Sequence, residues 1–301
     1  MMRLILMAAA FVAAHAQQPF LTDDADTAPL RHFHVEILSE YDSLQRTAYP
    51  TIRQSTTRLQ VTYGLLEKLE IGFDAPLLAI YNANGSGSPN AFGLGDFDLQ
   101  MKYRLREENE HSAWPAVTFG LYIELPTGKT QNQLGSGIAD YWLNGIVQKK
   151  LSPRVTYRLN SGMLFSGNTL TGAIGIRSTR GRVYTGASSV TYQLTPKLLI
   201  GGEVAGAFTR QFDLGKAQLQ TLFGGKYAIT KAVGLDFALT GGKFEGSPRV
   251  GAALGISFDF EVGPKRLRRA AQGRPAQVPE PSARFNDSSL SRTSTKLRLR
   301  K

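Results

Sequence analysis

Four charged side chains occupy alternate positions in a ten-residue stretch: Asp96, Asp98, Lys102 and Arg104. Two carboxylates at such a spacing could do acid–base chemistry, with one donating a proton and the other accepting it. The two cations follow on the same parity, so a ladder of opposite charges across a lumen is the better interpretation. We therefore expect these groups to balance one another's charge and not to catalyse a reaction.

A nucleotide site and a hydrolase site are both excluded by missing partners. The segment 125–130, LPTGKT, contains Gly-Lys-Thr, but Ile123 stands where a phosphate-binding loop needs its first glycine. A serine hydrolase needs a serine and a histidine held by a third group, and the chain has no G-x-S-x-G motif. We expect no enzyme activity.

Metal binding is also not expected. His32 and His34 form an H-x-H pair, but the chain has no cysteine and offers no clear third ligand. Asp23, Asp24 and Asp26 stand close enough to bind a hard cation, yet they lack the calcium-loop pattern. A turn or capping role is the better interpretation of these aspartates, and no cofactor is expected.

The charged stretch is itself one face of a strand. Phe97, Leu99 and Met101 alternate with the charged residues, and a period of two indicates an extended strand with one apolar and one polar face. Twelve segments show this alternation, which predicts an all-β fold: 32–42, 59–63, 69–77, 96–105, 117–125, 140–150, 155–165, 183–194, 198–208, 217–229, 233–240 and 249–260.

The connections between these segments alternate in length. Short ones fall at 65–68, 151–154, 195–197 and 230–232, with a slightly longer one at 106–113, and mostly longer ones, rich in Gly, Ser and Asn, fall between them. A soluble β-sandwich has no reason to sort its loops in this way, whereas a transmembrane barrel has short periplasmic turns and longer extracellular loops. The pattern predicts a single antiparallel transmembrane β-barrel of about twelve strands.

The two faces of the strands indicate which side meets lipid. Tyrosines on the apolar parity lie near the short turns, as in the aromatic girdle of a membrane barrel: Tyr63, Tyr103, Tyr157, Tyr192 and Tyr227. Charged residues occupy the other parity and should line a wet lumen: Glu70, Asp74, Asp96, Asp98, Lys102, Arg104, Glu124 and Arg158.

Four regions follow from composition. Residues 1–16 have a basic start, an apolar run and an A-x-A site, which predicts a cleaved secretory signal peptide. Residues 17–31 form an N-terminal periplasmic segment, residues 32–260 the barrel and residues 261–301 a basic disordered tail.

The basic character of the chain belongs to its tail. Residues 262–301 carry a net charge of +9, out of +11 for the whole chain, so the high pI does not indicate nucleic-acid binding by the folded part. We expect the tail to be a solvated appendage. The alternative is a contact with an anionic periplasmic partner or an electrostatic plug in the lumen.

Several short segments resemble one known family when they are taken in order: QPFLTDDADTAPLRHFHVEI (18–37), YGLLEKLEIGFDAPLL (63–78), GLGDFDLQMKYRL (93–105), ELPTGK (124–129) and ADYWLNGIVQKKL (139–151). They are similar to Gram-negative outer-membrane barrels grouped as transporters of a meta-cleavage pathway of phenol degradation. The resemblance implies a monomeric barrel in the cell outer membrane that passes small solutes, with aromatic or apolar compounds as candidates.

The expected function is therefore an outer-membrane channel for passive diffusion of a small-molecule solute through a charge-lined lumen. The alternative is a structural or surface-interaction barrel whose lumen is filled and whose extracellular loops do the work. Expected partners are outer-membrane lipid and the barrel-insertion machinery, which should read Phe258 and Phe260 at the end of the last strand.

Overall fold

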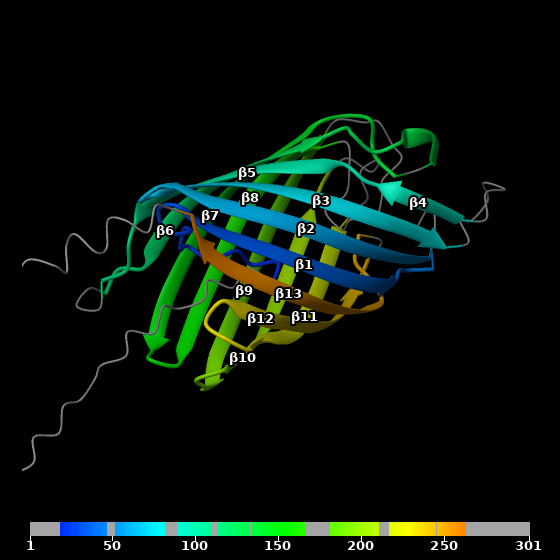
Figure 1. The fold of residues 1–301 in the computed structure, drawn as a ribbon. Coiled ribbons are helices and arrows are strands. Elements are labelled where there is room, and N and C mark those ends of the chain that lie inside the picture. Colours follow the sequence, from blue (N-terminus) through cyan, green and yellow to red (C-terminus); the bar gives the residue numbers. More distant parts are fainter. Residues whose placement is uncertain are drawn as a thin grey trace, which may run out of the picture. The chain divides into compact units, whose positions relative to one another are not determined.

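The computed structural model describes residues 19–46, 52–81, 90–109, 113–132, 134–166, 181–210, 217–244 and 246–262. The predicted signal peptide and the predicted tail from residue 263 onward lie outside the described residues. The folded unit is a single β-sheet that closes into a barrel (Figure 1).

The strands are antiparallel to their neighbours along the chain, and β1 also pairs with the last strand. Their bounds are β1 His32–Ser43, β2 Arg53–Leu66, β3 Leu69–Tyr81, β4 Asn90–Leu94, β5 Phe97–Arg106, β6 Ala116–Leu125, β7 Asp140–Ser152, β8 Val155–Ser166, β9 Gly181–Thr195, β10 Leu198–Phe208, β11 Ala217–Ala228, β12 Val233–Lys243 and β13 Val250–Glu261.

The barrel wall contains twelve strands, because β4 and β5 act as one. Both pair with β3, β4 against Leu77–Tyr81 and β5 against Leu69–Asp74. The interruption falls at Gly95 and Asp96. The prediction of a twelve-stranded antiparallel barrel is confirmed.

The polar start of β2 was not predicted as strand. Residues 53–58, RQSTTR, carry almost no apolar side chains and read as part of a loop, yet they pair with both β1 and β3. Hydrogen bonds on both sides therefore override the local sequence signal. Apart from the strands there is one short 3₁₀ helix, η1 Thr130–Asn132, and no helix among the described residues is long and apolar enough to span a membrane.

The barrel is apolar outside and polar inside, the reverse of a soluble protein. Large apolar side chains on the outer parity are exposed, as for Leu254 (71 %) and Leu239 (63 %). Charged and amide side chains on the inner parity are buried, as for Lys102 and Glu36 (each 1 %). This is the alternation expected when lipid surrounds the wall and polar groups line the lumen.

Aromatic rings mark both ends of the outer surface. Near the short turns Phe33 stacks between Tyr63 and Phe260, at centroid distances of 4.5 and 5.5 Å. Near the long loops Tyr41 and Tyr81 lie 6.4 Å apart. Rings at these two levels correspond to the interfacial girdles of a membrane barrel.

Candidate pore and its internal segment

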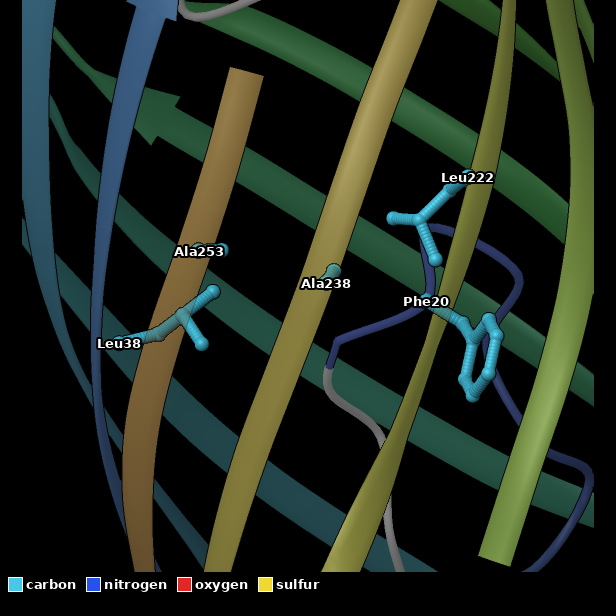
Figure 2. Close-up of a cluster of buried hydrophobic side chains, with 5 residues drawn as sticks. All are labelled: Phe20, Leu38, Leu222, Ala238 and Ala253. Atoms are coloured by element: carbon cyan, nitrogen blue, oxygen red, sulfur yellow. The ribbon is translucent and has the colours of Figure 1, made fainter.

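The chain preceding β1 lies inside the barrel. We call residues 19–31 the inner segment; its contacts are with inward-facing side chains of β3, β5, β6, β7 and β10, as described below. Figure 1 shows part of this segment as a dark-blue coil among the strands, and in Figure 2 it passes behind the strands of the wall. The residues that we expected to form a separate periplasmic segment therefore fill part of the lumen.

Lys102 is the electrostatic anchor of the inner segment. Its Nζ lies 2.9 Å from Asp23 Oδ1 and 3.1 Å from Asp24 Oδ1, and all three side chains are largely buried. Tyr122 on β6 donates a further hydrogen bond to Asp23. A buried cation between two carboxylates is stabilising only while all partners stay in place, so this cluster fixes the middle of the segment.

Two wall carboxylates bind the backbone of the segment at its two ends. Glu203 on β10 accepts hydrogen bonds from the backbone N–H of Leu21 (3.0 Å) and of Thr22 (2.6 Å), and from the Thr22 hydroxyl. Glu70 on β3 accepts one from Ala28 N–H at 2.6 Å. These bonds satisfy backbone donors that would otherwise be buried without partners, and they fix the direction in which the segment crosses the lumen.

The stretch between these ends packs against β6 and β7. Ala25 is fully buried, and its carbonyl accepts a hydrogen bond from Thr118 Oγ1 at 2.5 Å. Asp26 accepts one from Gln148 Nε2 at 3.0 Å and lies 4.0 Å from the Arg104 guanidinium. All three aspartates of the TDDADT motif therefore contact wall donors, and our prediction of a turn or capping role was wrong.

The segment joins the wall beside Gly64. Leu30 forms a parallel bridge with Gly64, and Arg31 N–H donates to the Gly64 carbonyl at 2.8 Å. A Cβ added to Gly64 would lie 2.0 Å from the Pro29 carbonyl oxygen, which is impossible without moving backbone. Glycine at this position is required for the inner segment to turn into the lumen.

Phe20, near the start of the described residues, is buried against the inner wall beside Gly201. In Figure 2 its ring lies nearest to Leu222, whereas Leu38 and Ala253 lie farther along the wall. A Cβ added to Gly201 would lie 2.8 Å from the Phe20 ring, so the missing side chain makes room for it. Phe20 belongs to a buried apolar cluster that also contains Leu38, Leu222, Ala238 and Ala253, with Leu199 packed against it.

Four carboxylates form a row across neighbouring strands toward the long-loop end of the lumen. Asp74 stands opposite Asp98, Asp98 opposite Glu124, and Glu124 opposite Asp140. Arg58 Nη1 lies 3.4 Å from Asp74 Oδ2 at one end of this row. The row makes this side of the lumen acidic.

The part of the wall next to this row, at the same end, is apolar. Leu164, Val183 and Ala207 form one buried cluster on the inner faces of β8, β9 and β10, with Trp142 packed against it. Trp142 donates its indole N–H to Thr185 Oγ1 at 3.1 Å. An acidic stretch of wall therefore adjoins an apolar one, and this combination suits a solute that has both an apolar body and a polar group.

The predicted charge ladder is wrong. Lys102 and Arg104 bind the inner segment, whereas Asp98 belongs to the carboxylate row. Asp96 tethers the β6–β7 connection, because its carboxylate accepts the backbone N–H groups of Gly128 and Ser136, each at 2.8 Å. The prediction was wrong because the binding partners of these four residues come from segments far away in the sequence.

The other predicted lumen residues also have identifiable contacts. Glu70 and Asp74 are buried on the inner face, where they bind Ala28 and Arg58 as described. Arg158 is buried too and donates from Nε to Gln148 Oε1 at 2.9 Å. Sequence reasoning missed Tyr122, Glu203 and Phe20 as functional candidates, and none of them carried a local signal beyond its parity.

The chain matches one protein family and several solved structures. Residues 47–260 match the model of the family described as "Putative MetA-pathway of phenol degradation". An outer membrane channel from Pseudomonas putida F1 is 16 % identical, with a TM-score of 0.63; the match covers 79 % of this chain and 98 % of that one. A KdgM porin solved in complex with disordered oligogalacturonate is 10 % identical, with a TM-score of 0.50, over 76 % and 99 % of the two chains.

At these identities the structural likeness shows a shared barrel fold. No curated protein sequence matches the chain.

Proposed function

The chain belongs to the phenol-degradation family of outer-membrane barrels, and from this premise we propose that it is a channel for small solutes, controlled by its inner segment. The observation that carries the proposal is the inner segment itself. It is bound across the lumen mainly by polar and ionic contacts, centred on Lys102, and not by a continuous apolar core. Contacts of this kind can exchange for water, so the segment can leave without unfolding the wall.

We infer the solute class from the carboxylate row and the Leu164 cluster, which lie toward the long-loop end of the lumen. The carboxylate row disfavours anions and favours cations or hydrogen-bond donors, while the Leu164 cluster favours an apolar body. We propose that small aromatic compounds with a polar group pass by diffusion, since they lose least on leaving bulk water at such a site. No catalytic step is part of this function.

The location follows from the outer face of the barrel. Exposed Leu and Phe side chains between two levels of aromatic rings match a lipid bilayer, and membership of this family supports the outer membrane as that bilayer. We propose that a single barrel is the working unit, and that Phe258 and Phe260 at the end of β13 are read by the insertion machinery.

The test uses the absence of cysteine from the native chain. A single cysteine replaces Asp42, which faces the lumen, and in a matched control it replaces Ile37, which faces outward on the same strand and is 41 % exposed. Each refolded variant is placed in a planar bilayer, and a small charged thiol reagent is added while single-channel current is recorded.

We expect the reagent to change the conductance of Asp42→Cys and to leave Ile37→Cys unchanged. The same response from both variants would place the current outside the lumen and refute the proposal. Absence of current in both variants, with correct folding verified by heat-dependent gel mobility, would favour the alternative of a filled barrel whose extracellular loops bind a partner.

A further inference from the structure

Three cations lie on the outer surface of the barrel at its long-loop end. Arg53 begins β2 and Lys243 ends β12, and both stand on the outward parity of their strands. Arg249 directly precedes β13, and its guanidinium donates a hydrogen bond of 2.9 Å to the hydroxyl of Ser43, an outward residue of β1. All three cationic side chains are exposed. We call these three residues the cationic rim.

The register of the sheet places the cationic rim on four neighbouring strands. Ser43 on β1 stands opposite Arg53 on β2 and opposite Val250 on β13, so Arg53 and Arg249 flank the same hydroxyl. The next strand is β12, which pairs with β13 and ends at Lys243. Because neighbouring strands lie about 4.8 Å apart, the rim extends over roughly 14 Å. This is wider than a single phosphate group.

Acids do not balance the rim on this surface. Within the part of the chain that the structure describes, Lys243 and Arg249 form no ion pair with an acid, and the acids of the strands at this end stand on the inward parity. Glu245 lies between the two in the sequence, outside the described residues. At the short-turn end, by contrast, the outward-facing Lys149 lies 2.9 Å from Glu108 Oε1. The long-loop end therefore presents positive charge to its surroundings.

The cationic rim lies at the level of the upper aromatic girdle. Tyr81 stands directly opposite Arg53, and Tyr41 precedes Ser43 by two residues on β1. The two tyrosine rings are exposed on the outer surface, with centroids 6.4 Å apart. Tyrosine rings of a membrane barrel lie at the boundary between acyl chains and headgroups. The cations therefore project sideways into the headgroup layer.

Phe244 adds an apolar ring to this surface. Its φ is 74°, a left-handed backbone conformation that bulky side chains rarely adopt. The ring centroid lies 5.9 Å from Lys243 Nζ, and the residue is 46 % exposed. A strained residue that holds an exposed ring beside a cation suits a layer that offers both apolar groups and anions.

We propose that the cationic rim and Phe244 form a binding surface for a phosphorylated glycolipid of the outer leaflet. The inference rests on the proposed membrane location and not on conduction. Arg53 and Arg249 bind one phosphate group through their planar guanidinium forks, and Lys243 binds a second one as a point charge. Phe244 packs against the start of an acyl chain. Bound lipid then links β12, β1 and β2, where the first and last strands of the barrel meet.

Two other partners fit the cationic rim less well. A phospholipid with one phosphate group would engage only part of a surface that is roughly 14 Å wide. A soluble polyanion would have to approach from the side of the barrel, at the level where the bilayer surrounds it. A lipid headgroup with two phosphate groups uses the whole rim and reaches it from the correct direction.

The binding test is native mass spectrometry of the refolded, detergent-solubilised full chain, titrated with diphosphoryl lipid A. The rim variant carries Arg53→Gln, Lys243→Gln and Arg249→Gln. A matched control removes the same charge from the other end of the barrel, by glutamine in place of three exposed lysines of the short turns: Lys68, Lys197 and Lys231. Heat-dependent gel mobility checks that each variant is folded. If the rim variant does not fold, Lys243→Gln with Arg249→Gln takes its place.

We expect the rim variant to bind diphosphoryl lipid A about a hundredfold more weakly than the native chain, since each cation near an anionic membrane surface contributes about fivefold. The control should keep the native affinity. Arg53→Lys with Arg249→Lys retains the charge and should lose less than about tenfold. Monophosphoryl lipid A and phosphatidylglycerol should each bind the native chain at least roughly tenfold more weakly than diphosphoryl lipid A.

Equal losses in the rim variant and the control would overturn the inference, and so would native affinity in the rim variant. Phosphatidylglycerol binding as tight as that of diphosphoryl lipid A would overturn the assignment to a glycolipid. Loss of heparin binding in the rim variant, with lipid A binding retained, would assign the rim to a soluble polyanion. Conductance is a separate readout, because the rim lies outside the lumen: we expect the rim variant to lose lipid A and to conduct as the native chain does.

Discussion

Replacing Lys102 by methionine should release the inner segment. Lys102 is 1 % exposed and holds both Asp23 and Asp24, whose side chains are 12 % and 4 % exposed. Removing one partner of a buried ion pair costs about 3–5 kcal/mol. Since lumen water can reach Asp23, the lower end applies, and about 3 kcal/mol corresponds to a roughly hundredfold weaker docking of the segment.

The assay is single-channel recording of Lys102→Met beside Lys226→Met. Lys226 is a second buried lysine of the inner wall, and it pairs with Asp236 on β12 and not with the inner segment. Both variants remove one positive charge from the lumen, so they differ in segment anchoring and not in charge. In Lys102→Met, the ratio of time spent in the high-conductance state to time spent closed should be about a hundredfold larger than in the native chain. In Lys226→Met this ratio should be unchanged. Equal behaviour of the two variants and the native chain would refute the anchoring role.

Three further outcomes follow from single contacts. Asp98→Asn, in the middle of the carboxylate row, should lower the cation preference of the pore, seen as a shift of the reversal potential toward zero in a salt gradient; an unchanged potential would show that the row does not face the permeating ion. Asp96→Ala should leave the barrel's unfolding temperature within a few degrees of native but make the connection at 126–139 sensitive to brief proteolysis. The reason is that two backbone N–H groups lose their acceptor, at a local cost of about 1–3 kcal/mol each. Equal cleavage rates in the variant and the native chain would contradict the tethering role of Asp96. Gly64→Ala should raise conductance as Lys102→Met does, because the new Cβ collides with the Pro29 carbonyl; a native conductance would show that the segment can enter the lumen by another path.

The wall could be predicted from the sequence because its determinants are local. Alternation between Phe97, Leu99 and Met101 on one side and charged residues on the other specifies a strand with two different environments. The sorting of short and long connections then specifies a membrane barrel. The errors arise where the local signal is weak, as in the polar start of β2, which is held by hydrogen bonds to both neighbouring strands.

The inner segment could not be predicted in the same way. Its partners come from strands all around the barrel, and Asp23 and Lys102 are 79 residues apart in the chain. One indirect signal was present: three aspartates precede the first strand, and two cations, Lys102 and Arg104, lie on the inner parity of β5. Matching these charges across the lumen would have required knowledge of which inward positions face one another.

The most direct test of the central claim is the single-channel conductance of a chain lacking residues 19–28, compared with the complete chain and with a chain lacking residues 263–301. Gln17 and Gln18 stay in the shortened chain so that the predicted signal-peptide site is retained. We expect larger conductance steps only when the inner segment is removed, with heat-dependent gel mobility confirming a folded barrel in each case. Identical steps in the complete chain and in the chain without residues 19–28 would contradict it.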